Sequence, residues 1–157
     1  MNQLLEEFWK WANITPEEYA QDVYGQRDRF EEDNFDHFIA LVAYAKQIVN
    51  QNFLSADDLD DLITIMAIDN ESEMVLEYVK ENSSNEQLEQ IISMGMVHLQ
   101  PQARWQIAEL IFARKPIRYI EKLNSLTKDS HPYVRKRAKN CIDFVAHGTG
   151  DDSLCSN

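Results

Sequence analysis

Turn-forming residues are scarce in this sequence, with four glycines and four prolines among 157 residues. Strand-rich folds need many such residues at their turns, whereas helical folds need few, so this scarcity disfavours a β-rich fold. The apolar fraction of 44% is ordinary for a globular protein and disfavours wholesale disorder. At this length we expect one domain with a sizeable core.

Signs of secretion and of membrane insertion are also missing. The only cysteines are Cys141 and Cys155, and the second lies in a polar stretch, so a structural disulfide is not expected. Glu6 and Glu7 stand where a signal peptide has apolar residues. No apolar run approaches the roughly 20 residues that a membrane span needs. These features predict a cytoplasmic protein that has no membrane partner.

Basic residues are few in the first two-thirds of the chain. Residues 1–99 contain five Lys and Arg against 21 Asp and Glu, a formal net charge of −16, whereas residues 100–157 carry a net +4. An acidic surface repels nucleic acid and attracts basic partners. The same composition is also explained by a surface that is merely well solvated.

Apolar residues recur at helical spacing along most of the chain. Start and stop signals predict about eight helices. The candidate segments are residues 2–12, 15–25 and 34–50, followed by six that begin near Ser55, Asn70, Asn85, Pro101, Pro116 and Ser130. The stretch 34–50 is apolar on nearly every side, which predicts a centrally buried helix. Short connections favour antiparallel pairing of consecutive helices. Residues 148–157 are predicted to be a disordered tail.

Several helix starts carry capping signals, in which a short polar side chain is followed three positions later by an acidic one. These pairs are Thr15 with Glu18, Ser55 with Asp58, and Asn70 with Glu73.

Residues 116–145 resemble a HEAT-type helical repeat. The family pattern has an Asp at the turn, then a Pro, a Val-Arg pair and a small residue, and the matching residues are Asp129, Pro132, Val134, Arg135 and Ala138. The resemblance implies that Asp129 and Arg135 tie the turns of neighbouring repeats together. About 31 residues upstream, Pro101, Ala103 and Arg104 repeat part of this pattern, but Ile107 stands where the small residue belongs.

The resemblance predicts an all-α fold, an irregular HEAT-like α-solenoid of helices stacked as antiparallel pairs. Residues 1–147 would form a single domain, with 55–147 as HEAT-like pairs and 1–54 as a divergent N-terminal cap. Extended surfaces of this kind bind macromolecules, although a fold does not by itself assign a function.

No set of residues in the sequence indicates catalysis, a metal or a cofactor. The four histidines are not at metal-ligand spacing, and the four glycines are too scattered for a phosphate-binding loop. The acids between Asp57 and Asp61 lack the glycine and the terminal glutamate of an EF-hand. We therefore expect a protein that is not an enzyme and has no cofactor.

The candidate partner-binding residues are acids expected on the exposed sides of their segments, together with a tryptophan that lies off the apolar stripe of the first helix. They are Glu31, Glu32, Asp33, Asp57, Asp60, Asp61 and Trp9. Exposed tryptophan favours a binding patch, and exposed acids favour a basic partner.

In size, acidity and helical architecture the chain is similar to the all-helical immunity proteins of bacterial toxin–immunity systems. That resemblance implies a partner that is a basic, nuclease-type toxin domain encoded by an adjacent gene and blocked at its active site. One alternative is a HEAT-like nucleic-acid binder or DNA glycosylase that uses the basic residues Arg135, Lys136, Arg137 and Lys139. Another is a regulatory scaffold.

Overall fold

The computed structural model describes residues 2–21, 32–114 and 119–147, and within these ranges all regular structure is helical. The prediction of an all-α fold is confirmed, with nine α-helices and one short 3-10 helix in the described ranges. The elements are α1 (Gln3–Ala12), α2 (Pro16–Gln21), η1 (Glu32–Asn34), α3 (Phe38–Val49), α4 (Ala56–Ile68), α5 (Met74–Asn82), α6 (Asn85–Gly95), α7 (Pro101–Arg114), α8 (Ile120–Leu126) and α9 (Pro132–His147).

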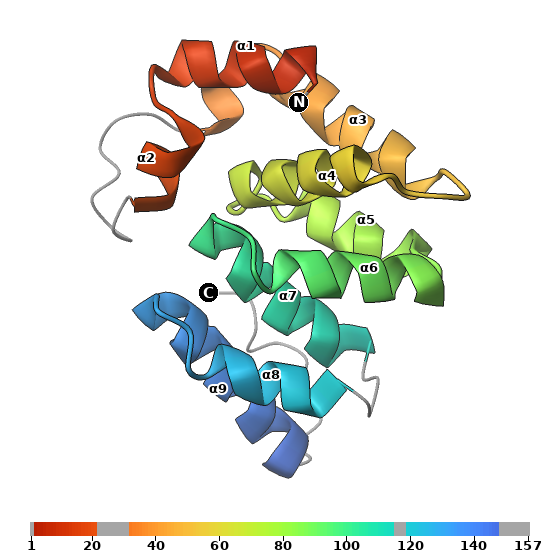
Figure 1. Ribbon diagram of the computed structural model, residues 1–157, viewed down its shortest axis with the longest axis vertical. Helices are drawn as coiled ribbons and strands as arrows, with labels where there is room; N and C mark the ends of the chain where they lie inside the picture. The colour runs from red at the N-terminus through yellow and green to blue at the C-terminus, as the bar shows by residue number, and fades with distance from the viewer. Residues whose placement is uncertain (1, 22–31, 115–118, 148–157) are drawn as a thin grey trace.

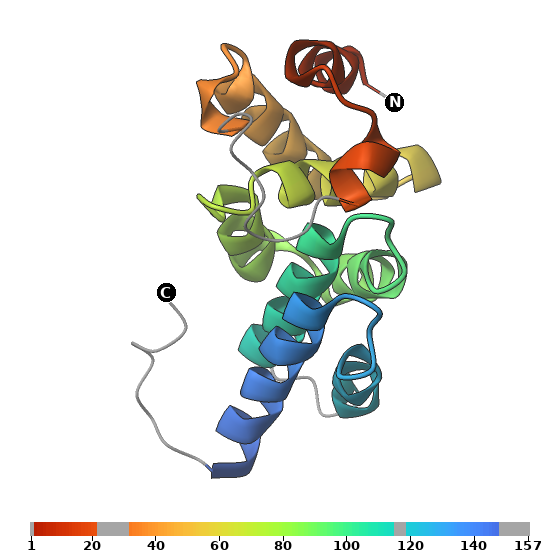
Figure 2. The ribbon, with the colours of Figure 1, turned by 90° about the vertical axis from the view of Figure 1, so that its left-hand side faces the viewer.

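The chain proceeds along the long axis of the molecule, from α1 at one end to α8 and α9 at the other (Figure 1). Helix α3 packs against α4 and α5, and α7 packs against both α4 and α9. Figure 2 shows α9 lying alongside α7. The helices that pack most extensively against one another are thus no more than three helices apart in the chain. None of the helices in the described ranges is long and apolar enough to cross a bilayer.

The most deeply buried helices are α4 and α7, not α3. Helix α3 buries one face but exposes Ile39, which is 68% accessible, so the prediction that residues 34–50 form a centrally buried helix was wrong. Helix α7 is buried along most of its length although it contains polar residues. One of these, Gln106, is fully buried and donates from Nε2 to the Met66 carbonyl of α4 at 2.6 Å. Hydrogen bonding of this kind lets a helix of low hydrophobicity occupy the interior.

Capping explains several of the helix starts. In the predicted boxes, Thr15 and Glu18 exchange hydrogen bonds, as do Ser55 and Asp58. A third box, formed by Ser84 and Gln87 at the start of α6, was not predicted.

The predicted cap at Asn70 was wrong, because α5 begins only at Met74. The residue before it, Glu73, has a left-handed backbone with φ of 53°. The Asp69 carboxylate instead accepts the Val75 N–H of the first turn at 2.7 Å. A buried aspartate several residues upstream therefore satisfies a helix-end donor that local spacing assigned to Asn70.

Helices α6 and α7 approach closely at Gly95. A Cβ atom at this position would lie 2.5 Å from both Cγ1 and Cδ1 of Ile107. Ile107 occupies the position where the repeat pattern calls for a small residue, and the glycine on the facing helix makes room for it.

Candidate functional site

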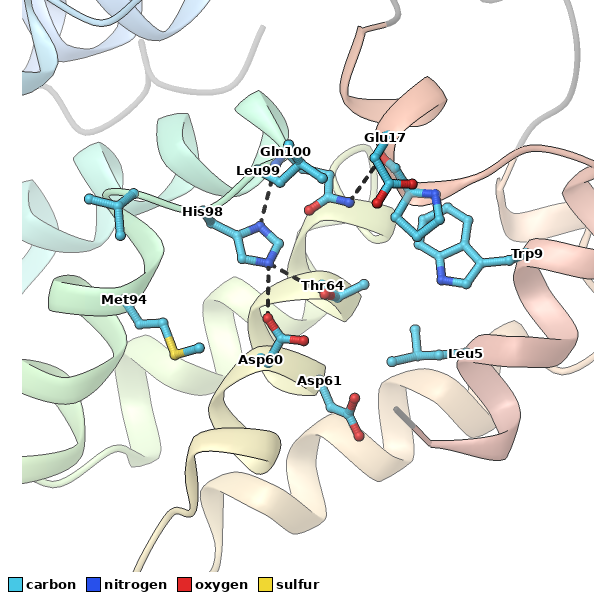
Figure 3. A pocket seen from close by; sticks show the side chains of 12 residues that line it. Leu5, Trp9, Glu17, Asp60, Asp61, Thr64, Met94, His98, Leu99 and Gln100 are labelled. Atoms are coloured by element: carbon cyan, nitrogen blue, oxygen red, sulfur yellow. Dashed lines mark hydrogen bonds and ion pairs between the residues drawn. The ribbon is translucent and has the colours of Figure 1, made fainter.

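A pocket of about 390 Å³ lies where the N-terminal helices meet α4 and the connection between α6 and α7 (Figure 3). Its volume falls within the range of small-ligand sites. The lining residues are Leu5 and Trp9 of α1; Pro16 and Glu17 of α2; Asp60, Asp61 and Thr64 of α4; Met94 of α6; and Val97, His98, Leu99 and Gln100 of the connection. Four separate segments of the chain therefore build this site, which we call the acidic pocket.

Three carboxylates line the acidic pocket, from two helices. Glu17 and Asp60 are exposed, whereas Asp61 is only 6% accessible and accepts a hydrogen bond from the Tyr44 hydroxyl at 3.2 Å. Burial raises the pKa of Asp61 above its ordinary value, and the hydrogen bond from Tyr44 partly opposes that rise.

His98 contributes no positive charge to the acidic pocket at neutral pH. Burial lowers its pKa below the ordinary 6.5, although the nearby carboxylate of Asp60 works in the opposite direction. Its Nε2 lies 3.4 Å from the Thr64 hydroxyl and 3.7 Å from the Asp60 carboxylate. Its Nδ1 accepts the Gln100 backbone N–H at 3.4 Å, which places the proton of the neutral ring on Nε2.

Two buried polar atoms on the walls of the acidic pocket have no hydrogen-bond partner. They are the indole Nε1 of Trp9 and the side-chain Oε1 of Gln100. Trp9 as a residue is 8% accessible, and Gln100 is 2% accessible. Figure 3 shows the nitrogen-bearing edge of the Trp9 ring turned toward the space between Leu5 and Thr64. Because a buried donor or acceptor without a partner costs free energy, such atoms indicate where a ligand could supply one.

Arg104 holds the connection that forms one wall of the pocket. Its Nη1 donates to the carbonyls of His98 and Leu99, each at 2.8 Å. Its Nε and Nη2 form a bidentate ion pair with Asp129, at 2.8 and 3.0 Å. Burial alone would raise the pKa of Asp129, but hydrogen bonds from Arg104 and from the His131 N–H hold that pKa below its usual value. Arg104 thus joins the pocket wall to the turn before α9.

A second arginine repeats half of this arrangement. Arg135 Nη1 donates to the carbonyls of Asp129 and Ser130, which precede it by the same intervals as His98 and Leu99 precede Arg104. The assignment of the link between turns to Arg135 was therefore wrong. Asp129 does join two turns, but its side-chain partner is Arg104, and these bonds of Arg135 stay within its own turn.

The expected exposure of the candidate residues holds only in part. Asp33, Asp57 and Asp60 are exposed as predicted, whereas Asp61 is buried. Trp9 was predicted to be exposed and is buried, whereas Trp11 on the same helix is 39% accessible.

Glu32 was also expected on the surface but is only 4% accessible, because its carboxylate accepts the Tyr19 hydroxyl at 2.8 Å. Glu31 lies outside the described residues.

The acidic pocket brings together Trp9, Asp60 and Asp61 from the predicted set. It does not include Asp57, which lies on the same helix as Asp60, nor Glu32 and Asp33, which belong to η1. Sequence reasoning missed Glu17, Thr64, His98 and Gln100, because no motif connects residues on four segments. The one available signal was a histidine, His98, between two apolar residues, Val97 and Leu99.

Besides Arg104, three arginines of the basic C-terminal part have structural partners. Arg114 donates to the carbonyls of Lys80 and Ser83. Arg137 forms an ion pair with Glu109 and lies over the Trp105 ring at 4.8 Å from its centroid. The third is Arg135, whose two carbonyl partners are described above. Lys136 and Lys139 are exposed, and Lys115 and Arg118 lie outside the described residues.

Comparisons with protein families, characterised proteins and solved structures give no significant match for this chain. In the described part of the chain, no three histidine, cysteine, aspartate or glutamate side chains are grouped so that they could hold a metal ion. Function is therefore inferred from the geometry and charge of the acidic pocket.

Proposed function

We propose that this chain is a protein-binding module whose partner is a basic protein that docks over the acidic pocket. The observation that carries the proposal is the convergence of Glu17, Asp60 and Asp61 on one pocket. Among the described residues that line it, none has a cationic side chain at neutral pH. Such a site favours positive charge, and the net charge of −16 over residues 1–99 would draw a basic partner toward it.

The finer proposal is an immunity protein that protects the cytoplasm of its producing cell against a nuclease-type toxin encoded by an adjacent gene. A nuclease active site is built to attract phosphates, so a surface of carboxylates can occupy and occlude it. In this mechanism the chain binds and blocks and catalyses nothing itself. The exposed acids Asp57 and Asp60 would steer association, and the acidic pocket would slow dissociation.

We also propose that the fold is an irregular HEAT-like solenoid, with residues 55–147 as stacked antiparallel pairs and 1–54 as a divergent cap. Support comes from the matching carbonyl contacts of Arg104 and Arg135, which recur 31 residues apart. The progression of helices along one axis is in keeping with such stacking (Figure 1).

The test is to co-express the chain with its adjacent-gene product and measure affinity at two salt concentrations. Replacing Asp57 and Asp60 together with Asn should weaken binding about tenfold at low salt and reduce its salt dependence. The charge-matched control replaces Glu86 and Glu121 with Gln, since both are exposed and neither lines the pocket. Growth of the co-expressing cells reports protection.

Two outcomes would count against this proposal. If the Asp57→Asn and Asp60→Asn variant keeps full affinity and the same salt dependence, the electrostatic mechanism is wrong. If the chain binds duplex DNA below micromolar concentration, and binding falls when Lys136 and Lys139 are neutralised, the nucleic-acid alternative replaces it.

A further inference from the structure

We infer that the acidic pocket binds one arginine side chain of the partner together with a main-chain carbonyl beside it. This inference rests on the proposed function and names the group that its site receives. The acidic pocket would then be the central anchor of the interface, with the exposed acids of α4 as its rim.

The acceptors of the acidic pocket are arranged for a forked donor and not for a point charge. Carboxylates stand on α2 and on α4, and the unpartnered Oε1 of Gln100 adds a neutral acceptor from the α6–α7 connection. A guanidinium has five N–H donors in a rigid plane and can serve acceptors on separate walls, whereas a lysine ammonium is a compact charge with three donors.

The apolar part of the lining also suits arginine. Leu5 and Met94 offer apolar surface for its methylene stem. A guanidinium is more weakly hydrated than an ammonium, so it loses less on entering a partly apolar pocket.

The Trp9 indole N–H requires an acceptor, which a cation cannot provide. In a peptide, the carbonyl next to an arginine is the nearest acceptor to the side chain that enters the pocket. This donor therefore favours a protein segment over a free polyamine, which has ammonium groups and no carbonyl.

The mouth of the acidic pocket also indicates a protein segment. Val97 and Leu99 are 81% and 50% accessible and flank His98 on the wall that Arg104 holds in place. Exposed apolar residues beside a charged pocket match the anatomy of a protein interface, in which apolar contacts surround a desolvated anchor.

The experiment uses capped tripeptides of glycine, arginine and glycine, titrated into the ¹⁵N-labelled full chain. The readout is the indole N–H signal of Trp9, assigned by its loss in Trp9→Phe, with Trp105 as an internal reference. We expect the Trp9 signal to shift and saturate with a dissociation constant of about 1 mM, a reasonable value for one anchored side chain. The Trp105 signal should not move.

Matched peptides and variants separate arginine recognition from general attraction. The citrulline tripeptide has the same shape without the charge, and it should bind at least about tenfold more weakly, as should the lysine tripeptide. Replacing Asp60 and Asp61 with Asn should abolish saturation, whereas replacing Glu86 and Glu121 with Gln should leave it intact. Thermal melts of both variants verify that each is folded.

No shift of the Trp9 signal up to the solubility limit of the peptide would overturn the inference, as would equal affinity for the citrulline or lysine peptide. Failure here is distinct from failure of the proposed function. If the adjacent-gene product binds and the arginine peptide does not, only the arginine assignment is wrong. If the peptide binds and the adjacent-gene product does not, the assignment stands and the proposed partner is wrong.

Discussion

At the scale of single residues, several buried polar side chains form hydrogen bonds with partners outside their own helical turn. Tyr19 and Tyr44 each donate to a carboxylate far away in the sequence, which allows Glu32 and Asp61 to be buried. Asp69 and Arg104 likewise bind groups outside their own helical turn. Removing one partner of such a buried pair costs more than the pair contributes, because the other is left unsatisfied.

Arg104 provides the clearest test at this scale. Its side chain and that of Asp129 are 12% and 9% accessible, so Arg104→Ala leaves a nearly buried carboxylate without its bidentate partner. We expect a loss of about 2–4 kcal/mol in the free energy of unfolding, measured by denaturant titration. Arg104→Lys should recover only part of it, since lysine lacks the fork.

Arg135→Ala is the matched control, because Arg135 makes the same kind of carbonyl contacts but has no such pairing with Asp129. This variant should lower the free energy of unfolding by about 1 kcal/mol. Equal losses for the two alanine variants would show that the ion pair with Asp129 adds nothing to stability.

At the scale of elements, the close contact of α6 with α7 depends on Gly95. Alanine is a better helix former than glycine by about 1 kcal/mol. At this position, however, its Cβ would lie 2.5 Å from two side-chain carbons of Ile107, which is completely buried. We therefore expect Gly95→Ala to destabilise the protein by about 1–3 kcal/mol, measured as a shift of the unfolding midpoint.

The double variant Gly95→Ala with Ile107→Ala tests whether the clash is the cause. In the Ile107→Ala background the substitution at Gly95 should no longer be destabilising, because the space occupied by the isoleucine is free. If Gly95→Ala costs as much in that background as it does in the unsubstituted chain, the destabilisation has another origin.

The elements were largely predictable from the sequence, because their signals are local. The Thr15 and Ser55 boxes involve residues three positions apart, and the helix stripes have a fixed period. The cap predicted at Asn70 was wrong because a competing acceptor, the buried carboxylate of Asp69, accepts the Val75 N–H of the first helical turn instead. The acidic pocket could not be predicted, since it requires four segments to meet, although two of its acids and its tryptophan belonged to the candidate set.

At the scale of the whole molecule, the pH dependence of stability combines carboxylates and a histidine whose pKa values move in different directions. Burial raises the pKa of Asp69 from 3.8 to about 6, so the folded state retains a proton that the unfolded chain has released. This contribution to stability is complete below about pH 4 and is lost as pH rises through about 6. Burial lowers the pKa of His98, so the stability that this histidine contributes to the folded state is lost as the pH falls below the ordinary pKa of 6.5. The two slopes oppose each other in mildly acidic solution.

Asp69→Asn separates them, because the histidine is the same in both proteins and cancels in the difference. An asparagine oxygen can still accept the Val75 N–H, while no charge has to be buried at neutral pH. The free energy of unfolding of the variant, relative to the unsubstituted chain, should therefore rise between about pH 4 and pH 7, by up to about 3 kcal/mol.

Asp129→Asn is the opposite control: the pKa of Asp129 is held low, so this variant should lose stability at neutral pH and lose less as the solution is acidified. Denaturant unfolding of the three proteins at a series of pH values measures both differences, and a pH-independent difference for Asp69→Asn would mean that this buried carboxyl does not bind its proton more tightly in the folded state.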